Sequence, residues 1–152
     1  MHTLISFEPN PDFFDAVDID APHFQPPFKE NIMPGKYVIS LTHGLDDTDR
    51  ATVAFVVANA AVASDKDTVV FLSIEGTRLS QKSVADSVHE EGFAPLKDLM
   101  DNFAKAGGKM FVCSPCFKKR KLDENNLVDG AAVVGGAKLV EFMSDGAPSI
   151  SY

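Results

Sequence analysis

The chain has 152 residues, of which 45% are apolar and 24% are charged, a composition that fits one compact domain and excludes a chain that is disordered or fibrous throughout. The formal net charge of −8 argues against a general nucleic-acid binder, because phosphate binding requires an excess of lysine and arginine on one face. The longest apolar stretch, 51–63, is interrupted by Thr52 and Asn59 and is shorter than the roughly 20 residues that span a bilayer, so we expect no membrane span.

Residues 1–35 differ in composition from the rest of the chain. They hold six of the nine prolines and five of the twelve phenylalanines. The prolines exclude a long helix, and the phenylalanines can anchor an extended segment on another surface. We predict an extended N-terminal arm that wraps its own domain or a neighbouring subunit, with a partly disordered tail as the alternative. The start of the chain lacks a basic segment followed by a continuous apolar one, so we expect a cytoplasmic protein and no secretory signal.

Regular patterns begin at Lys36. Residues 37–42 are apolar and β-branched and predict a strand. A loop follows, and Asp47 or Thr48 can cap a helix over 49–64. This helix is apolar on nearly every side, so one face can cover a sheet while the other meets another helix or subunit.

The middle of the chain continues the alternation. Residues 68–74 form a nearly continuous apolar run, typical of a strand in a parallel sheet covered on both faces. Residues 77–91 are mostly polar and predict a loop with a short helix. Apolar residues at helical spacing predict a helix over 95–106, which Gly107-Gly108 ends.

The last third adds three strands and two helices. We predict strands at 109–113, 131–134 and 149–152, a short helix that Ser114-Pro115 opens, and a helix over 136–143. Strands and helices alternate throughout. The order predicts right-handed crossovers and a three-layer α/β/α fold with a mainly parallel, five-stranded sheet.

Ligands of such sheets collect at the carboxyl ends of the strands. Here those ends carry His43 with the Asp46-Asp47 loop, Glu75-Gly76, and Cys113 with Cys116. We expect a site at this edge. His43 can instead hydrogen-bond the backbone, and Asp46 and Asp47 can serve as helix caps.

Cys113 is the leading candidate for chemistry. It precedes a helix, where unpaired N–H groups and the positive end of the dipole favour a thiolate. The basic run 118–121 can attract anions beside it, or it can be a solvated helix face. The Cys113 and Cys116 spacing also allows three other interpretations: two small residues in apolar packing, a zinc site completed by His43, His89 or another subunit, and thioredoxin-type exchange.

Several motifs resemble the DsrE/DsrF-like sulfur-relay family. They are Cys113-x-x-Cys116-x-x-x-Arg120, then Leu127-x-Asp129-Gly130, then a helix and a terminal strand, with a loop His43-Gly44-x-Asp46-Asp47-x-x-Arg50-Ala51 near the start. The resemblance covers 36–152 and gives the boundary between the arm and a DsrE-like domain. Many members have glycine after the arginine, where this chain has Lys121, so we expect the turn there to differ.

The resemblance implies a function. Members form trimers or hexamers and carry sulfane sulfur as a persulfide on a cysteine after the third strand, the position of Cys113. We therefore expect a sulfur carrier or sulfurtransferase subunit without a cofactor, working between sulfur-donor and sulfur-acceptor proteins, with Cys116 as an auxiliary thiol. Substrate or anion contacts are assigned to His43, Arg50, Ser114 and Arg120, although Arg50 can instead pair with an acidic neighbour. The alternative is a non-enzymatic DsrE-like binding or structural module.

Overall fold

The computed structural model describes residues 35–152. The predicted N-terminal arm, apart from Gly35, lies outside the described residues. Within 35–152, no helix is both long and apolar enough to cross a membrane.

Five parallel strands form one sheet, in the order β4-β3-β2-β1-β5. The predicted five-stranded parallel sheet is confirmed. The strands are β1 (Lys36–Leu41), β2 (Asp67–Leu72), β3 (Lys109–Cys113), β4 (Ala131–Val134) and β5 (Ser149–Ser151).

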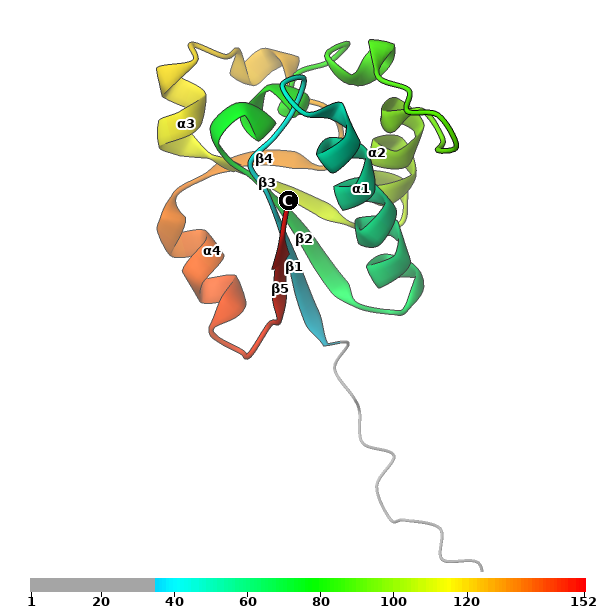
Figure 1. Ribbon diagram of the computed structural model, residues 1–152. Helices are drawn as coiled ribbons and strands as arrows, with labels where there is room; N and C mark the ends of the chain where they lie inside the picture. The colour runs from blue at the N-terminus through cyan, green and yellow to red at the C-terminus, as the bar shows by residue number, and fades with distance from the viewer. Residues whose placement is uncertain (1–34) are drawn as a thin grey trace, which may run out of the picture. The chain divides into compact units, whose positions relative to one another are not determined.

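The helices cover the sheet from both sides, as Figure 1 shows. From β1 to β4 the chain advances in one direction, so right-handed crossovers put α1 and α2 on one face. The return from β4 to β5 puts α4 on the other face, which gives the predicted three layers. The α-helices are α1 (Thr48–Ala63), α2 (Leu96–Lys105), α3 (Ser114–Lys119) and α4 (Gly136–Met143), and short 3-10 helices are η2 (Ile74–Ser80), η3 (Ala85–Ser87) and η4 (Glu124–Asn126).

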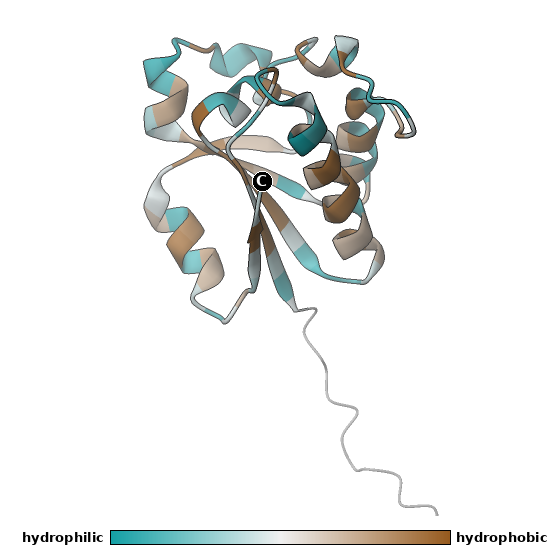
Figure 2. Ribbon diagram, viewed as in Figure 1, coloured by the Kyte–Doolittle hydropathy of each residue, from teal (hydrophilic) through white to brown (hydrophobic). Residues whose placement is uncertain are grey.

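The core divides between the two faces because side chains alternate along each strand. On the larger side, Ile39, Val70 and Met110 pack beneath α1 and α2, and Phe55 of α1 meets Phe103 of α2 edge to face at 5.9 Å. On the other side, Val38 and Val69 pack with Phe111, which meets Phe142 of α4 at 6.0 Å. Figure 2 shows the apolar residues concentrated on the central strands and on α1.

Helix α1 begins as predicted. Asp47 is its N-cap and accepts a hydrogen bond from the Arg50 amide at 3.1 Å. The interpretation that its second face meets another helix is confirmed at Phe55, which contacts α2.

The predicted strand 68–74 is too long. β2 ends at Leu72, and Ile74 begins η2 with a φ of +51°. The amide of Ser73 donates to Leu41 O and that of Gly76 to Thr42 O, both at 3.0 Å. These bonds turn the chain across the end of β1, so the apolar run does not continue as a strand.

Candidate functional site

The candidate site lies at the carboxyl edge of the sheet. β3 ends at Cys113, and Cys116 follows in the first turn of α3. Because the strands are parallel, η2 after β2 and the 42–47 loop after β1 lie at the same edge. The topology brings together three segments that are distant in the sequence.

Local sequence explains the placement of the two thiols. Pro115 lies in the first turn of α3, where its missing N–H costs no hydrogen bond. Phe117 is buried and fixes the helix on the core. Both cysteines are free and half-buried, so they combine partial protection with access from solvent.

The two thiols are electrostatically unequal. Burial raises the pKa of Cys113, and so does a hydrogen bond from its thiol to Cys116, while the Cys116 amide and the charge of Arg120 oppose the rise without cancelling it. The expected lowering of the Cys113 pKa by the helix is therefore wrong. Because α3 has only six residues, burial and the neighbouring sulfur determine the direction in which the pKa of Cys113 shifts.

Cys116 shifts in the opposite direction. Burial alone would raise its pKa, but hydrogen bonds from the Cys113 thiol and the Ile74 amide, with the positive charges of Arg120 and Lys119, hold the pKa below its usual value. Cys116 is therefore the more acidic thiol of the pair.

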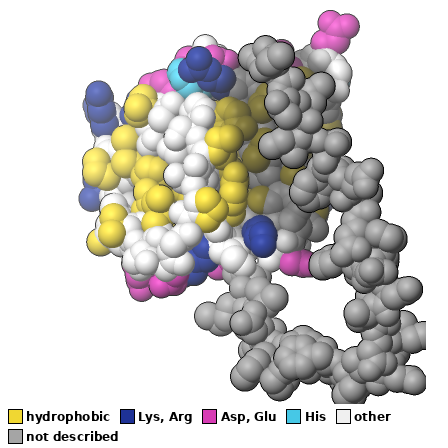
Figure 3. All heavy atoms as spheres, turned by 60° about the horizontal axis from the view of Figure 1, so that its bottom comes forward, with side chains coloured by type: hydrophobic (Ala, Val, Ile, Leu, Met, Phe, Trp, Pro, Cys, Tyr) yellow, Lys and Arg dark blue, Asp and Glu magenta, His cyan; other side chains and the backbone are white. Residues whose placement is uncertain are grey.

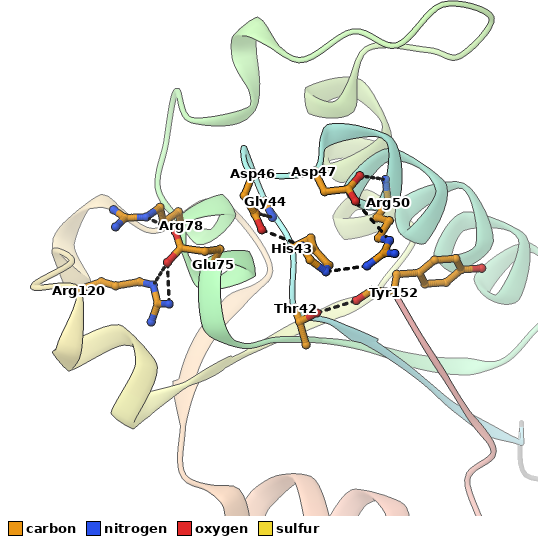
Figure 4. A network of polar contacts seen from close by, with 10 residues as sticks. All are labelled: Thr42, His43, Gly44, Asp46, Asp47, Arg50, Glu75, Arg78, Arg120 and Tyr152. Carbon is orange, nitrogen blue, oxygen red and sulfur yellow. Dashed lines mark hydrogen bonds and ion pairs between the residues drawn. The ribbon is translucent and has the colours of Figure 1, made fainter.

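Arg120 connects α3 to η2. Its Nε and Nη2 donate to Glu75 Oε1 at 3.0 and 2.7 Å, and its Nη1 donates to Cys116 O at 3.2 Å. Figure 4 shows Glu75 between Arg120 and Arg78. Hydrogen bonds from Arg78 and Arg120 lower the pKa of Glu75, so the carboxylate stays charged and keeps α3 and η2 together.

The basic run does not act as one patch. The Arg120 side chain is 9% exposed and ion-paired, whereas Lys118, Lys119 and Lys121 are exposed. Lys121 adopts a φ of +52°, a conformation that glycine takes readily and other residues take at a cost. Lysine therefore occupies a left-handed turn position where glycine would fit without strain.

His43 and Arg50 form a second network (Figure 4). Arg50 Nη1 donates to His43 Nε2 at 2.9 Å, so the ring proton lies on Nδ1, which donates to Asp46 Oδ2 at 2.7 Å. Burial would raise the pKa of Asp46, but hydrogen bonds from the Gly44 amide and His43 lower it overall. Arg50 also contacts Asp47 at 3.3 Å. The alternative interpretation of Arg50, a pairing with an acidic neighbour, is therefore confirmed.

Two glycines let these loops approach each other. A Cβ at Gly76 would lie 2.6 Å from Leu41 O, and one at Gly44 would lie 2.9 Å from Glu75 O. Both contacts are with backbone, which cannot rotate away. The approach joins the loop of the His43 network to the turn that carries Ile74 and Glu75.

The remaining assigned residues are placed as follows. Ser114 is half-buried in the first turn of α3. His89 donates to Phe93 O at 2.9 Å, and within 35–152 no group of three histidine, cysteine or acidic residues could hold a metal ion. A zinc site on the cysteine pair would thus need ligands from beyond these residues. A cavity of about 540 Å³ lies elsewhere, between α2, the 81–86 segment and the loop before β4.

Sequence reasoning missed the contribution of η2. The apolar run places Ile74 inside a strand and makes Glu75 only the end of that strand, whereas both residues belong to η2. The signal that could have revealed them is the Glu75-Gly76 pair, since a glycine after an apolar strand often marks a close backbone approach.

The geometry defines a small α/β protein with a pair of free thiols at the carboxyl edge of a parallel sheet. The model of the DsrE/DsrF-like family matches residues 35–152, and the chain belongs to that family.

Three individual proteins are similar to this chain. The YchN protein from E. coli superposes with a TM-score of 0.65 at 16% identity, over 78% of this chain and 99% of YchN. MTH1491 from Methanobacterium thermoautotrophicum, described as a protein of unknown function, gives 0.62 at 16% identity, with the same coverage. These two likenesses show the fold. The uncharacterized protein MJ0760 of Methanocaldococcus jannaschii is 27% identical over 108 residues, which are 71% of this chain and 39% of that protein. The chain thus spans about two-fifths of that relative's length.

Proposed function

We propose that the protein is a cysteine-based sulfur carrier, or sulfurtransferase subunit, that holds sulfane sulfur as a persulfide on Cys113. The observation that carries the proposal is the half-buried pair of free thiols beside the buried Arg120, at the sheet edge, in a chain of the DsrE/DsrF-like family. A thiolate is the species that attacks sulfane sulfur, and the lowered pKa of Cys116 favours a thiolate within the pair.

The transfer needs no cofactor. A donor persulfide yields its outer sulfur to Cys113, the donor S–S bond breaks, and the donor leaves as a thiolate. In the second step a cysteine of an acceptor protein attacks the same outer sulfur and Cys113 is regenerated. Partial burial of Cys113 shields the persulfide between the two encounters. Free thiols of this kind match a reducing compartment, so we assign the protein to the cytoplasm.

The polar residues around the pair take binding roles in this proposal. Ser114 begins α3 between the two cysteines, and Arg120 is the C-cap of the same helix. His43 and Arg50 lie on the loop and helix after β1. Arg120 and Arg50 are ion-paired, so we assign them to orientation of the incoming donor rather than to capture of a free anion.

We also propose that copies of the chain associate, as a trimer or hexamer. Figure 3, in which the lower side of Figure 1 comes forward, shows apolar side chains gathered on that face. Exposed apolar residues of the described chain include Val140 of α4, at 67%, and Ile150 of β5, at 37%. Light scattering of the full chain tests this, and a monomeric mass would contradict it.

The sulfur-carrier proposal is tested by mass spectrometry. The intact protein is weighed before and after anaerobic incubation with a persulfide donor, beside Cys113→Ser. We expect the wild type alone to gain sulfur that a reductant removes. If reduced, accessible Cys113 gains none while assembly and partner binding persist, the non-enzymatic binding module becomes the better account.

A further inference from the structure

Two residues near the thiols adopt a left-handed backbone conformation that their side chains disfavour. Ile74 has a φ of +51° and Lys121 has a φ of +52°. A β-branched or bulky residue rarely adopts this conformation, whereas glycine takes it readily. Both side chains are exposed, that of Ile74 at 53%. Packing within residues 35–152 therefore does not account for a large side chain at either position.

The two turns have structural reasons, but the side chains on them do not. The bonds to the end of β1 described above fix the turn at Ile74. After Lys121, the amide of Leu122 donates to Phe117 O at 3.3 Å, and Leu122 packs again on the core. Backbone strain that persists because its surroundings fix it is typical of functional sites. We infer that the exposed side chains themselves are used.

Both residues flank one ion pair beside the thiols. Ile74 precedes Glu75, and Lys121 follows Arg120. Arg120 Nη2 and Glu75 Oε1 lie 2.7 Å apart (Figure 4), and Arg120 Nη1 donates to Cys116 O at 3.2 Å. The ion pair thus places an exposed apolar side chain and an exposed cation at the turn that carries Cys116.

The same part of the chain is strongly basic. Residues 114–122 include four basic residues and no acidic one, in a chain with a net charge of −8. Lys118, Lys119 and Lys121 are exposed. None of these three lysines forms an ion pair with another residue of 35–152. Their positive charge is available to attract a negatively charged partner and to direct its approach.

From these observations, and resting on the sulfur-carrier function above, we propose a docking surface for the sulfur donor. It consists of Ile74, Lys118, Lys119 and Lys121. The partner that it fits is a protein whose persulfide-bearing cysteine lies in an acidic segment, next to an apolar side chain. Ile74 supplies the apolar contact and the lysines supply a charged rim, as in other protein interfaces.

Other anionic partners fit this surface less well. A small anion such as thiosulfate needs donors that converge on it, but the Arg120 guanidinium is already bound by Glu75 and the three lysines are exposed. A nucleic acid needs an extended basic face, which a chain with a net charge of −8 does not favour. A short acidic segment needs only a few exposed cations and one apolar contact.

The first test measures docking without sulfur transfer. Two short synthetic peptides each carry one reduced cysteine beside a leucine, flanked by glutamates in one peptide and by glutamines in the other. Fluorescence anisotropy with the reduced full chain gives both dissociation constants. At low salt we expect the glutamate peptide to bind about tenfold more tightly. The preference should disappear near 1 M salt, where the screening length is about 3 Å.

Charge variants locate the preference on the surface. Changing all three lysines of the docking surface to glutamine should make the two peptides bind alike. The matched control changes Lys66, Lys105 and Lys109 to glutamine. These exposed lysines lie at the amino edge of the sheet, before β2, at the end of α2 and at the start of β3. The control removes the same charge and should keep the preference.

Ile74→Gly tests the apolar contact. Glycine relieves the left-handed strain, so the variant should unfold no more easily than the wild type. It should nevertheless bind the glutamate peptide about fivefold more weakly, the loss typical of a residue central to an interface. A glutamate peptide with serine in place of the leucine should bind the variant and the wild type alike. A purely structural role of Ile74 would not give this dependence on the peptide.

Persulfide forms of the two peptides separate this inference from the proposed function. At low salt Cys113 should gain sulfur faster from the glutamate peptide, and only the variant of the docking-surface lysines should lose that advantage. If the glutamate preference depends on those lysines but no sulfur reaches Cys113, the docking surface stands and the carrier function fails. If both peptides load Cys113 equally in the wild type and in the lysine variant, the carrier function stands and the docking surface is refuted. Displacement of the glutamate peptide by thiosulfate beyond the effect of chloride at equal ionic strength would also refute it.

Discussion

The tight turn at Gly76 gives the sharpest structural test. In Gly76→Ala the added Cβ would lie 2.6 Å from Leu41 O and 3.1 Å from His43 O, so the 74–76 segment must move away from β1. Overpacking against rigid groups costs about 1–3 kcal/mol, and loss of the 3.0 Å hydrogen bond from the Gly76 amide to Thr42 O adds about 0.5–1.5 kcal/mol. We expect the free energy of unfolding to fall by about 1.5–4.5 kcal/mol, the sum of those two ranges.

Urea unfolding measures this loss. With a slope of about 2 kcal/mol per molar urea, the midpoint should fall by roughly 0.8–2.2 M. Gly136→Ala is the control, because no neighbouring group lies within 4 Å of a Cβ there and the residue lies inside α4, where alanine is the better helix former; its midpoint should not fall. Equal midpoints for the two variants would refute the close approach.

Three further changes test other parts of the chain. Phe103→Ala removes a fully buried ring that contacts Phe55 and should lower the free energy of unfolding by about 3–5 kcal/mol in the same urea assay. Ala106 is exposed, so Ala106→Ser should change that free energy by less than about 0.5 kcal/mol. Lys121→Gly removes a lysine with left-handed backbone geometry and should raise the melting temperature slightly, because the relieved strain of about 1–2 kcal/mol exceeds the flexibility cost of glycine. Lys118 lies inside α3, so Lys118→Gly should lower the melting temperature. The pKa of Glu75 is lowered from its usual value near 4.5. The ion pairs of Glu75 therefore stabilise the fold at pH values above about 4.5, and this stabilisation is lost as the pH falls through the lowered pKa of the folded state. Below about pH 5, the stability of Glu75→Gln should vary less with pH than the stability of the wild type.

Much of the fold follows from the sequence because each element carries its own periodicity. The parallel sheet, the alternation of strands and helices, and the Asp47 cap are visible in local patterns. The end of β2 is not, since Ile74 extends an apolar run and only the backbone contacts with β1 turn the chain away at Leu72. Long-range contacts decide that boundary, and no window of neighbouring residues contains them.

In the candidate site, too, some features follow from neighbouring residues in the sequence and others from residues that are distant in the chain. The cysteine spacing and its place after a strand predict thiol chemistry at the sheet edge, and the structure has both thiols there. The motif alone also predicts a thiolate on Cys113, by analogy with cysteines at helix starts. The pKa of Cys113 is instead raised, by burial and by the neighbouring sulfur. The pKa of Cys116 is the one that is lowered, by Cys113 and by the Ile74 amide, which lies about forty residues earlier in the chain.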